Sequence, residues 1–513
     1  MTQLECDVCI VGGGTGGTAA ALALAEHNLR IIVTESTDWI GGQLTAQAVP
    51  PDENPWIEST GCTASYRDYR NRVRKHYRLF ENLTPQAAQN PRLNPGSGWV
   101  SHLCHSPAIG HQVLREMLAL EQNPNISLLI ETIPIQADTN QSEVISIITR
   151  NTKTGEHYQI TAKFFLDATE LGDLLPLTQT EYNLGSESKS QTGEPNATDY
   201  PNETENVQSF TWCAALAYDE DADYTIDKPE QYDFWANYQP PNWPDKLLSF
   251  SMLHVQRGQS LYFPLFENDG FNLFTYRQIT QPDFHTDNRL AATIMNWPMN
   301  DYDGGTVIDV PVEEAEKHYD SAKHLTLSML YWLQIEKGYK GLRFAPEHTG
   351  TPDGLAKSAY IRESRRIKAL HTICEQDVAA YTNPGLIVAP EMPKSVGIGA
   401  YRIDLHPSAN GRPTLDTSTL PFQIPLGSLI PERTKNLLAA CKNLGVTHIT
   451  NGCYRLHPVE WNIGESAGIL AAFCITNKCS PHQVQESDDL FSDYQNWLWQ
   501  HGVLTDWPRL RPL

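Results

Sequence analysis

The sequence predicts an α/β fold, built on a Rossmann-like, doubly wound parallel sheet with an added β-hairpin or meander. An α+β domain is inserted into this unit. The first 35 residues contain an apolar strand, a glycine-rich turn, a helix and a second apolar strand. A further strand ends in Asp167-Ala168-Thr169 after a predicted hairpin. Nucleotide-type elements occur near both ends of the chain with a mixed segment between them, which indicates an insertion.

The glycine-rich turn spans residues 12–17, with the sequence GGGTGG, directly after the apolar run Cys6–Val11. In a Gly-x-Gly-x-x-Gly turn, the first glycine allows the tight bend and the second lets the backbone approach a pyrophosphate. The third lets the helix lie close to the strand. The start of that helix presents free N–H groups and a partial positive charge to the phosphates. We therefore expect the dinucleotide to be bound by Gly12, Gly14, Thr15, Gly16 and Gly17.

The second apolar strand, residues 31–34, ends at Glu35 and Ser36. A carboxylate at this position accepts hydrogen bonds from both ribose hydroxyls and repels a 2′-phosphate. The site therefore favours FAD or NAD over NADP, with Glu35 and Ser36 as contacts.

Composition excludes several classes of partner. The 513 residues carry a formal net charge of −23, whereas nucleic acid or an anionic membrane would require a basic face. No apolar run reaches the ~18 residues that span a bilayer. The chain enters its first strand without a charged leader, and its ten cysteines show no repeated spacing. We expect a cytoplasmic protein with reduced thiols and no membrane span.

The chain divides into four predicted segments. Residues 1–180 form the first part of the dinucleotide-binding domain, and residues 181–390 form an inserted substrate or cap domain. Residues 391–478 complete the dinucleotide-binding domain, and residues 479–513 form a C-terminal helix and tail. Within these segments, patterning predicts helices over 312–336, 358–377 and 464–474 and a strand over 436–440.

Three further motifs resemble those of flavoproteins. They are Gly41-Gly42-Gln43 after the Glu35 strand, Asp167-Ala168-Thr169, and a late strand followed by Asn443 and a helix opening at Gly464. Together they make the chain similar to bacterial FAD-dependent oxidoreductases of the glutathione-reductase structural class, related to the fumarate reductase and succinate dehydrogenase flavoproteins. The resemblance implies FAD as cofactor. It adds as contacts Gly41, Gly42, Gln43, Asp167, Ala168, Thr169, Asn443, Gly464, Glu465 and Ala467.

The sequence contains one dinucleotide fingerprint, whereas a pyridine-nucleotide disulfide reductase carries a second fingerprint and a redox cysteine pair beside the flavin. We therefore expect no separate NAD(P)H domain. Electrons are expected to pass to or from oxygen, a quinone or a carrier protein.

A cluster of arginines supplies candidates for a substrate anchor. Arg362 lies on one face of the predicted helix together with Arg365 or Arg366, at a spacing of three or four residues. Arginine suits a carboxylate because its donors are planar and bidentate. The competing interpretations are an ion-pair network with Glu363 or other acids, and contact with the flavin phosphates.

Two histidines are candidates for proton transfer. His457 and Arg455 would face the same side of an extended segment, and His406 precedes a proline in a similar context. For each histidine, hydrogen bonding to the backbone in a turn is the alternative. His102 and His105 have no matching second pair, so we expect no metal site.

The combined motifs predict an enzyme that transfers hydride between flavin N5 and a small polar substrate, which a carboxylate would suit. An oxidase or dehydrogenase is favoured over an NAD(P)H-dependent reductase. Two alternatives stay open. One is reduction of an activated double bond, as in fumarate reductase. The other is a flavin-loaded sensor or partner protein without turnover. Oligomeric state does not follow from the sequence.

Overall fold

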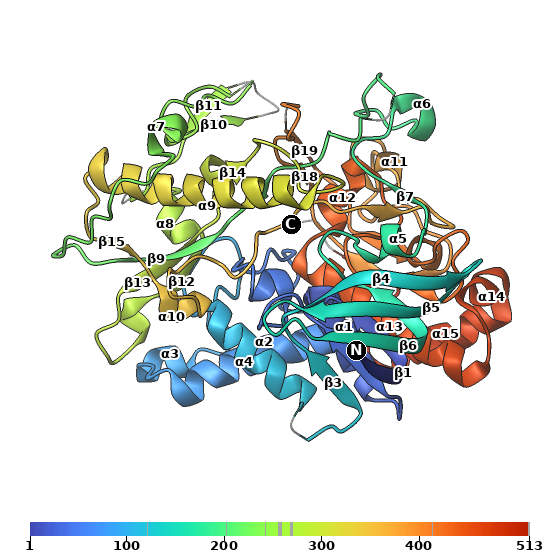
Figure 1. The fold of residues 1–513 in the computed structure, drawn as a ribbon. Coiled ribbons are helices and arrows are strands. Elements are labelled where there is room, and N and C mark those ends of the chain that lie inside the picture. Colours follow the sequence, from blue (N-terminus) through green and yellow to red (C-terminus); the bar gives the residue numbers. More distant parts are fainter. Residues whose placement is uncertain are drawn as a thin grey trace.

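The structure of the chain is a computed structural model (Figure 1). It describes residues 1–120, 122–201, 203–241, 243–254, 259–266, 270–412 and 414–510. All ten cysteines are free thiols. No helix in these ranges has the length and apolar character needed to cross a membrane.

The largest sheet has a parallel core, as predicted. Its parallel strands run in the order β3 (Ile126–Leu129), β2 (Ile31–Thr34), β1 (Thr2–Val11), β6 (His157–Asp167) and β21 (Leu437–Ala439). Every residue of β2 and β21 is buried, which is typical of strands covered by helices on both faces. The carboxyl ends of these strands meet at one edge of the sheet, where ligands of doubly wound folds bind.

The predicted hairpin is also present and belongs to a three-stranded meander. β4 (Thr132–Asn140), β5 (Glu143–Asn151) and β6 pair antiparallel in this order. The first half of β6 pairs with β5, while its last three residues, Phe165 to Asp167, pair with β21. The meander therefore extends from the same strand that delivers Asp167 to the edge of the sheet.

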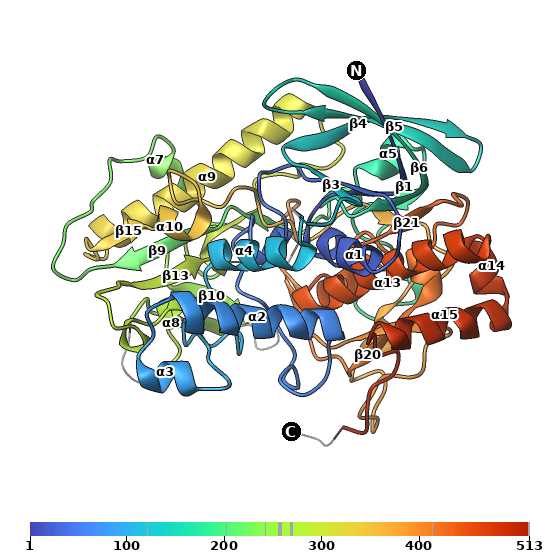
Figure 2. The ribbon, with the colours of Figure 1, turned by 90° about the horizontal axis from the view of Figure 1, so that it is seen from below.

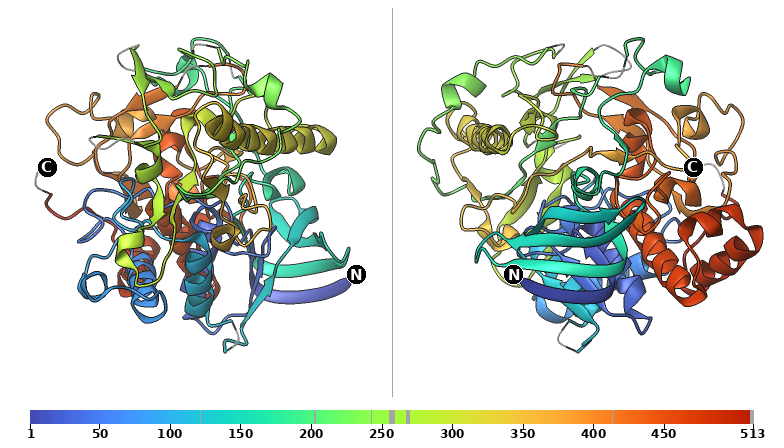
Figure 3. Two further views of the ribbon diagram at one scale, coloured as in Figure 1. Left: turned by 90° about the vertical axis from the view of Figure 1, so that its left-hand side faces the viewer. Right: turned by 45° about the vertical axis from the view of Figure 1, so that its right-hand side comes forward.

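Two glycine-bearing helices pack directly against each other beside this sheet. They are α1 (Thr15–Ala25) and α13 (His457–Asn477), which lie side by side in Figure 2. A Cβ atom at Gly464 would lie 2.0 Å from the Gly16 carbonyl oxygen, so only glycine allows this approach. The contact joins the two ends of the chain, and Figure 3 shows the C-terminal helices beside the strands of the large sheet.

A second layer forms around a smaller antiparallel sheet. Its strand order is β12 (Gln278–Thr280), β13 (Ala291–Met295), β9 (Ala214–Tyr218) and β15 (Leu342–Phe344). Helix α9 (Val312–Ile335) confirms the helix predicted over 312–336 and packs on this sheet within a separate apolar cluster. The α+β character expected of the middle of the chain is therefore observed.

The helix predicted over residues 358–377 is wrong. This segment is extended, with the short strand β16 (Arg366–Ile367) and a single helical turn, α11 (Glu375–Val378). Its backbone forms hydrogen bonds with another segment of the chain, since Tyr360 and Thr211 exchange backbone hydrogen bonds. The three arginines are buried by separate partners, so their spacing does not reflect one helix face.

Candidate functional site

A cavity of about 520 Å³ lies where the carboxyl ends of β1, β2 and β6 meet. Seven of the residues predicted to bind the cofactor line it: Gly12, Gly14, Glu35, Ser36, Gly42, Ala168 and Thr169. Motifs far apart in the sequence therefore contribute to one wall.

Glycines in this wall allow neighbouring segments of the chain to approach one another closely. Gly12 has φ +100, and a Cβ atom there would lie 2.2 Å from the Ala168 carbonyl oxygen. Gly14 is the N-cap residue of α1, so no side chain occupies the free N–H groups there. A Cβ atom added at Gly14 would lie 2.8 Å from a carboxylate oxygen of Glu170. The free N–H groups at the start of α1 suit a phosphate. Thr15, Gly16 and Gly17 form the first turn of this helix behind the cavity surface.

Glu35 is buried at the end of β2, with its carboxylate fixed by its neighbours. One oxygen accepts hydrogen bonds from Thr37 N at 2.8 Å and Thr37 Oγ1 at 2.9 Å, and the other accepts from Gly13 N at 3.0 Å. Burial raises the pKa of Glu35 to about 7. The group is held as an acceptor, the role that ribose hydroxyls require.

A buried charge cluster lies beside the start of α1. Lys442 Nζ pairs with a carboxylate oxygen of Glu170 and lies 3.5 Å from Glu460 Oε2, which accepts a hydrogen bond from Gln43 Nε2 at 3.1 Å. Burial alone would lower the pKa of Lys442, but the two carboxylates raise it. Glu170 lines the cavity, so the cluster places a cation directly behind its wall.

The helix start predicted at Gly464 is wrong, since α13 begins at His457. Gly464 contacts α1, and Glu465 accepts a hydrogen bond from Ser65 Oγ at 2.6 Å. Asn443 Nδ2 donates to the Asp167 carbonyl oxygen at 3.0 Å and so joins β21 to β6. The 520 Å³ cavity is not lined by Asn443, Gly464, Glu465 or Ala467, nor by Gly41, Gln43 or Asp167.

A second cavity, of about 470 Å³, brings together three predicted catalytic residues, Arg362, His406 and Arg455. Other polar groups of its wall are Asp52, Tyr276, Arg277, Tyr360, Tyr401 and Asp404. Apolar and aromatic side chains of the middle segment complete it.

Arg362 and Arg455 are each 2% exposed and bonded to a carboxylate. Arg362 Nη2 lies 2.9 Å from Asp301 Oδ1, and Arg455 Nη2 lies 3.5 Å from Asp404 Oδ2. Arg455 Nη1 also donates to the Tyr360 hydroxyl at 2.6 Å. In the described part of the chain, Nε of both arginines has no hydrogen-bond partner, which leaves donors for a ligand.

His406 lies between two carboxylates. Its Nδ1 is 2.5 Å from Asp301 Oδ2, and its Nε2 is 3.5 Å from Asp404 Oδ2. Burial would raise the pKa of both aspartates, but the neighbouring arginines and His406 hold each below its usual value. Both carboxylates therefore stay ionised beside the imidazole.

The structure places His457 and Arg365 elsewhere. His457 is fully buried in the first turn of α13, and its Nδ1 accepts a hydrogen bond from Asp52 N at 2.9 Å. Burial lowers its pKa well below the usual value, so the ring is neutral. The prediction that it shares a side with Arg455 is wrong, because Arg455 ends α12 (His448–Tyr454) and a turn follows.

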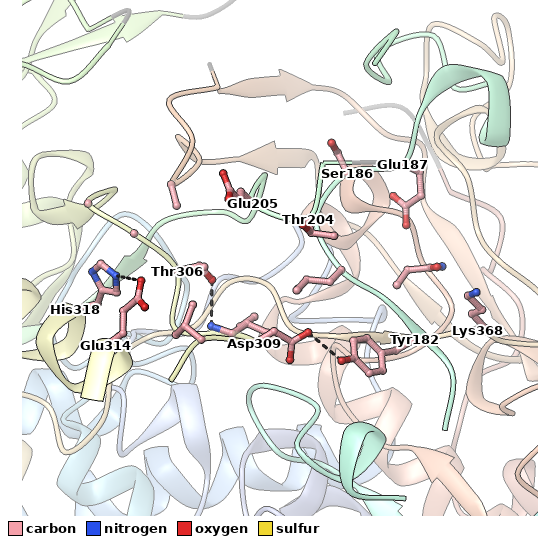
Figure 4. Close-up of a pocket in the computed structure, with 17 residues that line it drawn as sticks. Tyr182, Ser186, Glu187, Thr204, Glu205, Thr306, Asp309, Glu314, His318 and Lys368 are labelled. Carbon is pink, nitrogen blue, oxygen red and sulfur yellow. Dashed lines mark hydrogen bonds and ion pairs between the residues drawn. The ribbon is translucent and has the colours of Figure 1, made fainter. Parts of the chain in front are cut away.

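Arg365 pairs with Asp309 at 2.7 Å and Asp173 at 3.3 Å. Asp309 lines a third cavity, of about 650 Å³, where the Tyr182 hydroxyl donates to its carboxylate (Figure 4). Arg366 is buried between Glu363 and Glu187, which agrees with the ion-pair alternative. Within the described ranges, no group of three or more His, Cys, Asp or Glu residues could hold a metal.

One extended segment separates the first two cavities. Ala359 and Ile361 line the 520 Å³ cavity, whereas Tyr360 and Arg362 line the 470 Å³ cavity. Side chains of an extended chain alternate in direction, so the segment forms a partition with one face toward each cavity.

Sequence reasoning missed Asp52 and Arg277 in the second cavity and Glu170 in the first. Asp52 follows Pro50-Pro51 only a few residues after the glycine pair, which was an available signal. Arg277 lies in the middle segment without any motif, and only the folded chain brings it near Asp52.

Comparisons with known proteins identify the family of the chain. A curated relative, the FAD-dependent monooxygenase ntnJ of Nectria sp, is 39% identical over 59 residues, which are 12% of this chain and only 14% of that relative. The L-proline dehydrogenase from P. horikoshii is 17% identical, with 33% of this chain and 23% of that chain covered and a TM-score of 0.19. Quinol fumarate reductase FrdA of E. coli is 13% identical, with 98% and 74% covered and a TM-score of 0.33. The family model described as FAD dependent oxidoreductase matches residues 7–498, and the chain therefore belongs to this family.

Proposed function

We propose that the protein transfers hydride between FAD and a small polar substrate bound in the 470 Å³ cavity. The observation that carries the proposal is the partition of residues 359–362, which places the cofactor-type cavity and the arginine-lined cavity back to back. Hydride transfer requires the reacting carbon to lie against the flavin, so adjacent cavities are what the reaction needs.

The first cavity fits FAD in its chemistry. Gly12, Gly14 and Gly42 line the cavity without side chains, so a pyrophosphate could approach the backbone there, and Glu35 offers carboxylate oxygens to ribose hydroxyls. Bound FAD would supply an acceptor or donor for two electrons at N5.

The protein's own contribution to the reaction is to orient the substrate and move a proton. Arg362 and Arg455 present buried donors that would fix an acceptor group of the substrate. A titratable group of the same wall, His406 or an aspartate, would exchange the proton. The aromatic wall would exclude water.

The direction of electron flow is part of the proposal. A single dinucleotide fingerprint supports oxidation of the substrate, with electrons passed on to oxygen, a quinone or a carrier, rather than reduction by NAD(P)H. Reduction of an activated double bond is a second candidate, because Arg362 and Arg455 beside His406 could bind an unsaturated acid and supply a proton.

Anaerobic spectroscopy tests the proposal. Purified protein should contain FAD, and a panel of small polar substrates should include some that bleach the oxidised flavin spectrum. Rapid reoxidation of reduced protein by unsaturated acids would favour the second candidate instead. Protein that binds no FAD, or whose FAD reacts with no member of either panel, would contradict both.

A further inference from the structure

We propose that Arg277 and Asp52 handle the substrate as a pair, and that the substrate is a carboxylate with a hydroxyl or amine on its α-carbon and an apolar side chain. Arg277 binds the carboxylate, and Asp52 takes the proton of the α-substituent. The inference rests on the proposed function, since it concerns the same cavity.

Arg277 has donors that the described residues do not use. Its side chain is 11% exposed, and its one recorded ion pair is with Asp52, at 3.7 Å from Nη1 to Oδ2. Nε and Nη1 have no hydrogen-bond partner in these ranges of the chain. Buried donors without partners are rare in folded proteins, so each needs an explanation. A carboxylate bound along either edge of the guanidinium takes one of these two donors together with Nη2.

Other unsatisfied atoms in the same wall are also donors. Asn296 Nδ2, Trp243 Nε1 and Trp297 Nε1 lack hydrogen-bond partners among the described residues, as does Nε of both Arg362 and Arg455. A wall with several free N–H groups favours a ligand rich in oxygen acceptors.

Asp52 is the complementary group. It is 5% exposed and lines the cavity, and its backbone N–H donates to His457, which fixes the position of this residue. Burial raises its pKa, although Arg277 and Arg455 oppose this shift. Asp404, Asp416 and His406 line the same cavity. Asp404 is held ionised by its own partners, Asp416 pairs with Arg402, and both ring nitrogens of His406 lie against aspartates. Asp52 is therefore the best placed proton acceptor of the cavity.

The short separation of the pair sets the chemistry of the ligand. Asp52 and Arg277 are too far apart for a hydrogen bond, yet close enough that groups on neighbouring carbons would reach both. A carboxylate with a proton-bearing substituent on the next carbon satisfies both groups at once.

The wall becomes apolar with distance from Arg277. The guanidinium lies over the Tyr276 ring at 5.2 Å, the Tyr276 ring lies 4.9 Å from Phe271, and Phe271 lies 4.8 Å from Phe263. Met252 and Leu261 extend the same wall. This continuous gradient fits an apolar side chain beyond the α-carbon.

The polar end of the 470 Å³ cavity adjoins the chain segment that follows the glycine pair Gly41-Gly42. Gln47 lines the first cavity, and Asp52 lines the second after a short stretch of chain. Gln43 Nε2 donates to the Arg455 carbonyl oxygen at 3.0 Å. The α-carbon would therefore lie toward the flavin, and the apolar side chain away from it.

The proposed step oxidises the α-carbon of the substrate. The C–H bond of the α-carbon breaks, and its hydride, with both electrons, is transferred to bound FAD. The O–H or N–H proton is transferred to Asp52, and a C=O or C=N bond forms. The substrate is thus oxidised by two electrons, and oxygen, a quinone or a carrier removes them from the cofactor afterwards.

The experiment uses FAD-loaded protein and four probes. Phenyllactate carries the hydroxyl, phenylalanine carries the amine, hydrocinnamate lacks both, and 3-phenylpropanol lacks the carboxylate. We expect hydrocinnamate, but not 3-phenylpropanol, to perturb the flavin absorbance without reducing it. Phenyllactate or phenylalanine should reduce the flavin anaerobically, and whichever does so identifies the α-substituent.

Two variants separate the roles. Arg277→Met should weaken hydrocinnamate binding about 100-fold, whereas Asp52→Asn should retain binding and slow flavin reduction at least about 100-fold. Arg72→Met, at an exposed ion pair with Asp68, is the matched control and should behave as the original protein. FAD content and thermal unfolding show whether each variant folds.

Unchanged hydrocinnamate binding by Arg277→Met, or unchanged reduction by Asp52→Asn, would overturn the inference. So would reduction of the flavin by polar compounds without a carboxylate while all four probes fail. That last result would leave the proposed function standing, whereas protein that binds no FAD would remove the proposed function itself.

Discussion

A side chain at Gly464 would occupy the space of the Gly16 carbonyl oxygen. Gly464→Ala should lower the free energy of unfolding by about 1–3 kcal/mol, because α1 and α13 would have to separate. Gly468→Ala is the matched variant on the same helix, and its Cβ would lie 2.8 Å from Ala20 O instead of 2.0 Å from Gly16 O. Gly468→Ala should therefore lower the free energy of unfolding by less than Gly464→Ala.

Urea unfolding measures the stability of both glycine variants. We expect the midpoint concentration of urea to fall and the dependence of the free energy on urea concentration to stay unchanged. A role in cofactor contact alone would instead lower FAD affinity and leave the midpoint in place. Equal midpoints for Gly464→Ala and the original protein would contradict the packing account.

Residues of the cofactor cavity were predictable where a local motif determines them. Gly12, Gly14 and Glu35 follow from a strand, a turn and a second strand that are contiguous in the sequence. The pairing of Arg277 with Asp52 was not predictable, because their proximity depends on how the middle segment folds back onto the residues after the glycine pair. No periodicity of either segment encodes that contact.

At the scale of elements, the side chains of residues 359–362 point alternately into the two cavities. Substitutions at neighbouring positions of this segment should therefore affect different cavities. Ala359→Phe would place a ring in the 520 Å³ cavity and should weaken FAD binding about tenfold or more. Tyr360→Phe changes the other face and removes the 2.6 Å bond to Arg455, so FAD binding should be retained.

Quenching of FAD fluorescence on titration with each variant measures the two affinities. Equal loss of affinity in both variants would show that the segment does not divide the cavities. Thermal unfolding of the apo-proteins controls for misfolding.

The same segment shows why some elements escaped prediction. Arg362, Arg365 and Arg366 have helical spacing, yet each is buried against a different carboxylate: Asp301, Asp309 and Glu363 respectively. Burial of an arginine depends on a partner from elsewhere in the fold. The strands β1, β2 and β21 were predictable because continuous apolar runs suffice to specify buried parallel strands.

At the scale of the whole molecule, five buried carboxyl groups of the described residues have pKa values raised to about 7 by burial: Glu35, Asp167, Glu194, Glu460 and Glu465. In the unfolded chain such groups titrate near pH 4 to 4.5. Between these values the folded chain retains protons that the unfolded chain has released. Each group should therefore make the free energy of unfolding fall as pH rises, by up to ~1.4 kcal/mol per pH unit. Buried histidines such as His105 and His457, whose pKa values burial lowers, contribute in the opposite direction below about pH 6.5.

Urea unfolding of apo-protein from pH 5 to pH 8 measures how the free energy of unfolding changes with pH in the original protein and in two variants. Glu465→Gln removes one falling contribution, so its slope between pH 5 and pH 7 should be more positive than that of the original protein, and its amide oxygen can still accept from Ser65. Glu58, whose pKa the neighbouring arginines lower to about 2 against the effect of burial, titrates below this window, so Glu58→Gln should leave the slope unchanged. Identical slopes for Glu465→Gln and the original protein would refute the prediction.

β6 pairs with β1 from the start of the chain and with β21 from near its end, and α13 follows β21. A ribosome therefore releases β1, the glycine turn and β6 long before their last neighbours emerge. During translation, the nascent chain exposes the side of α1 that α13 later covers. The packed arrangement of α1 and α13 therefore forms only after the intervening middle segment has been synthesised. Assembly of the layer beside the large sheet is thus coupled to synthesis of a helix more than 400 residues further along the chain.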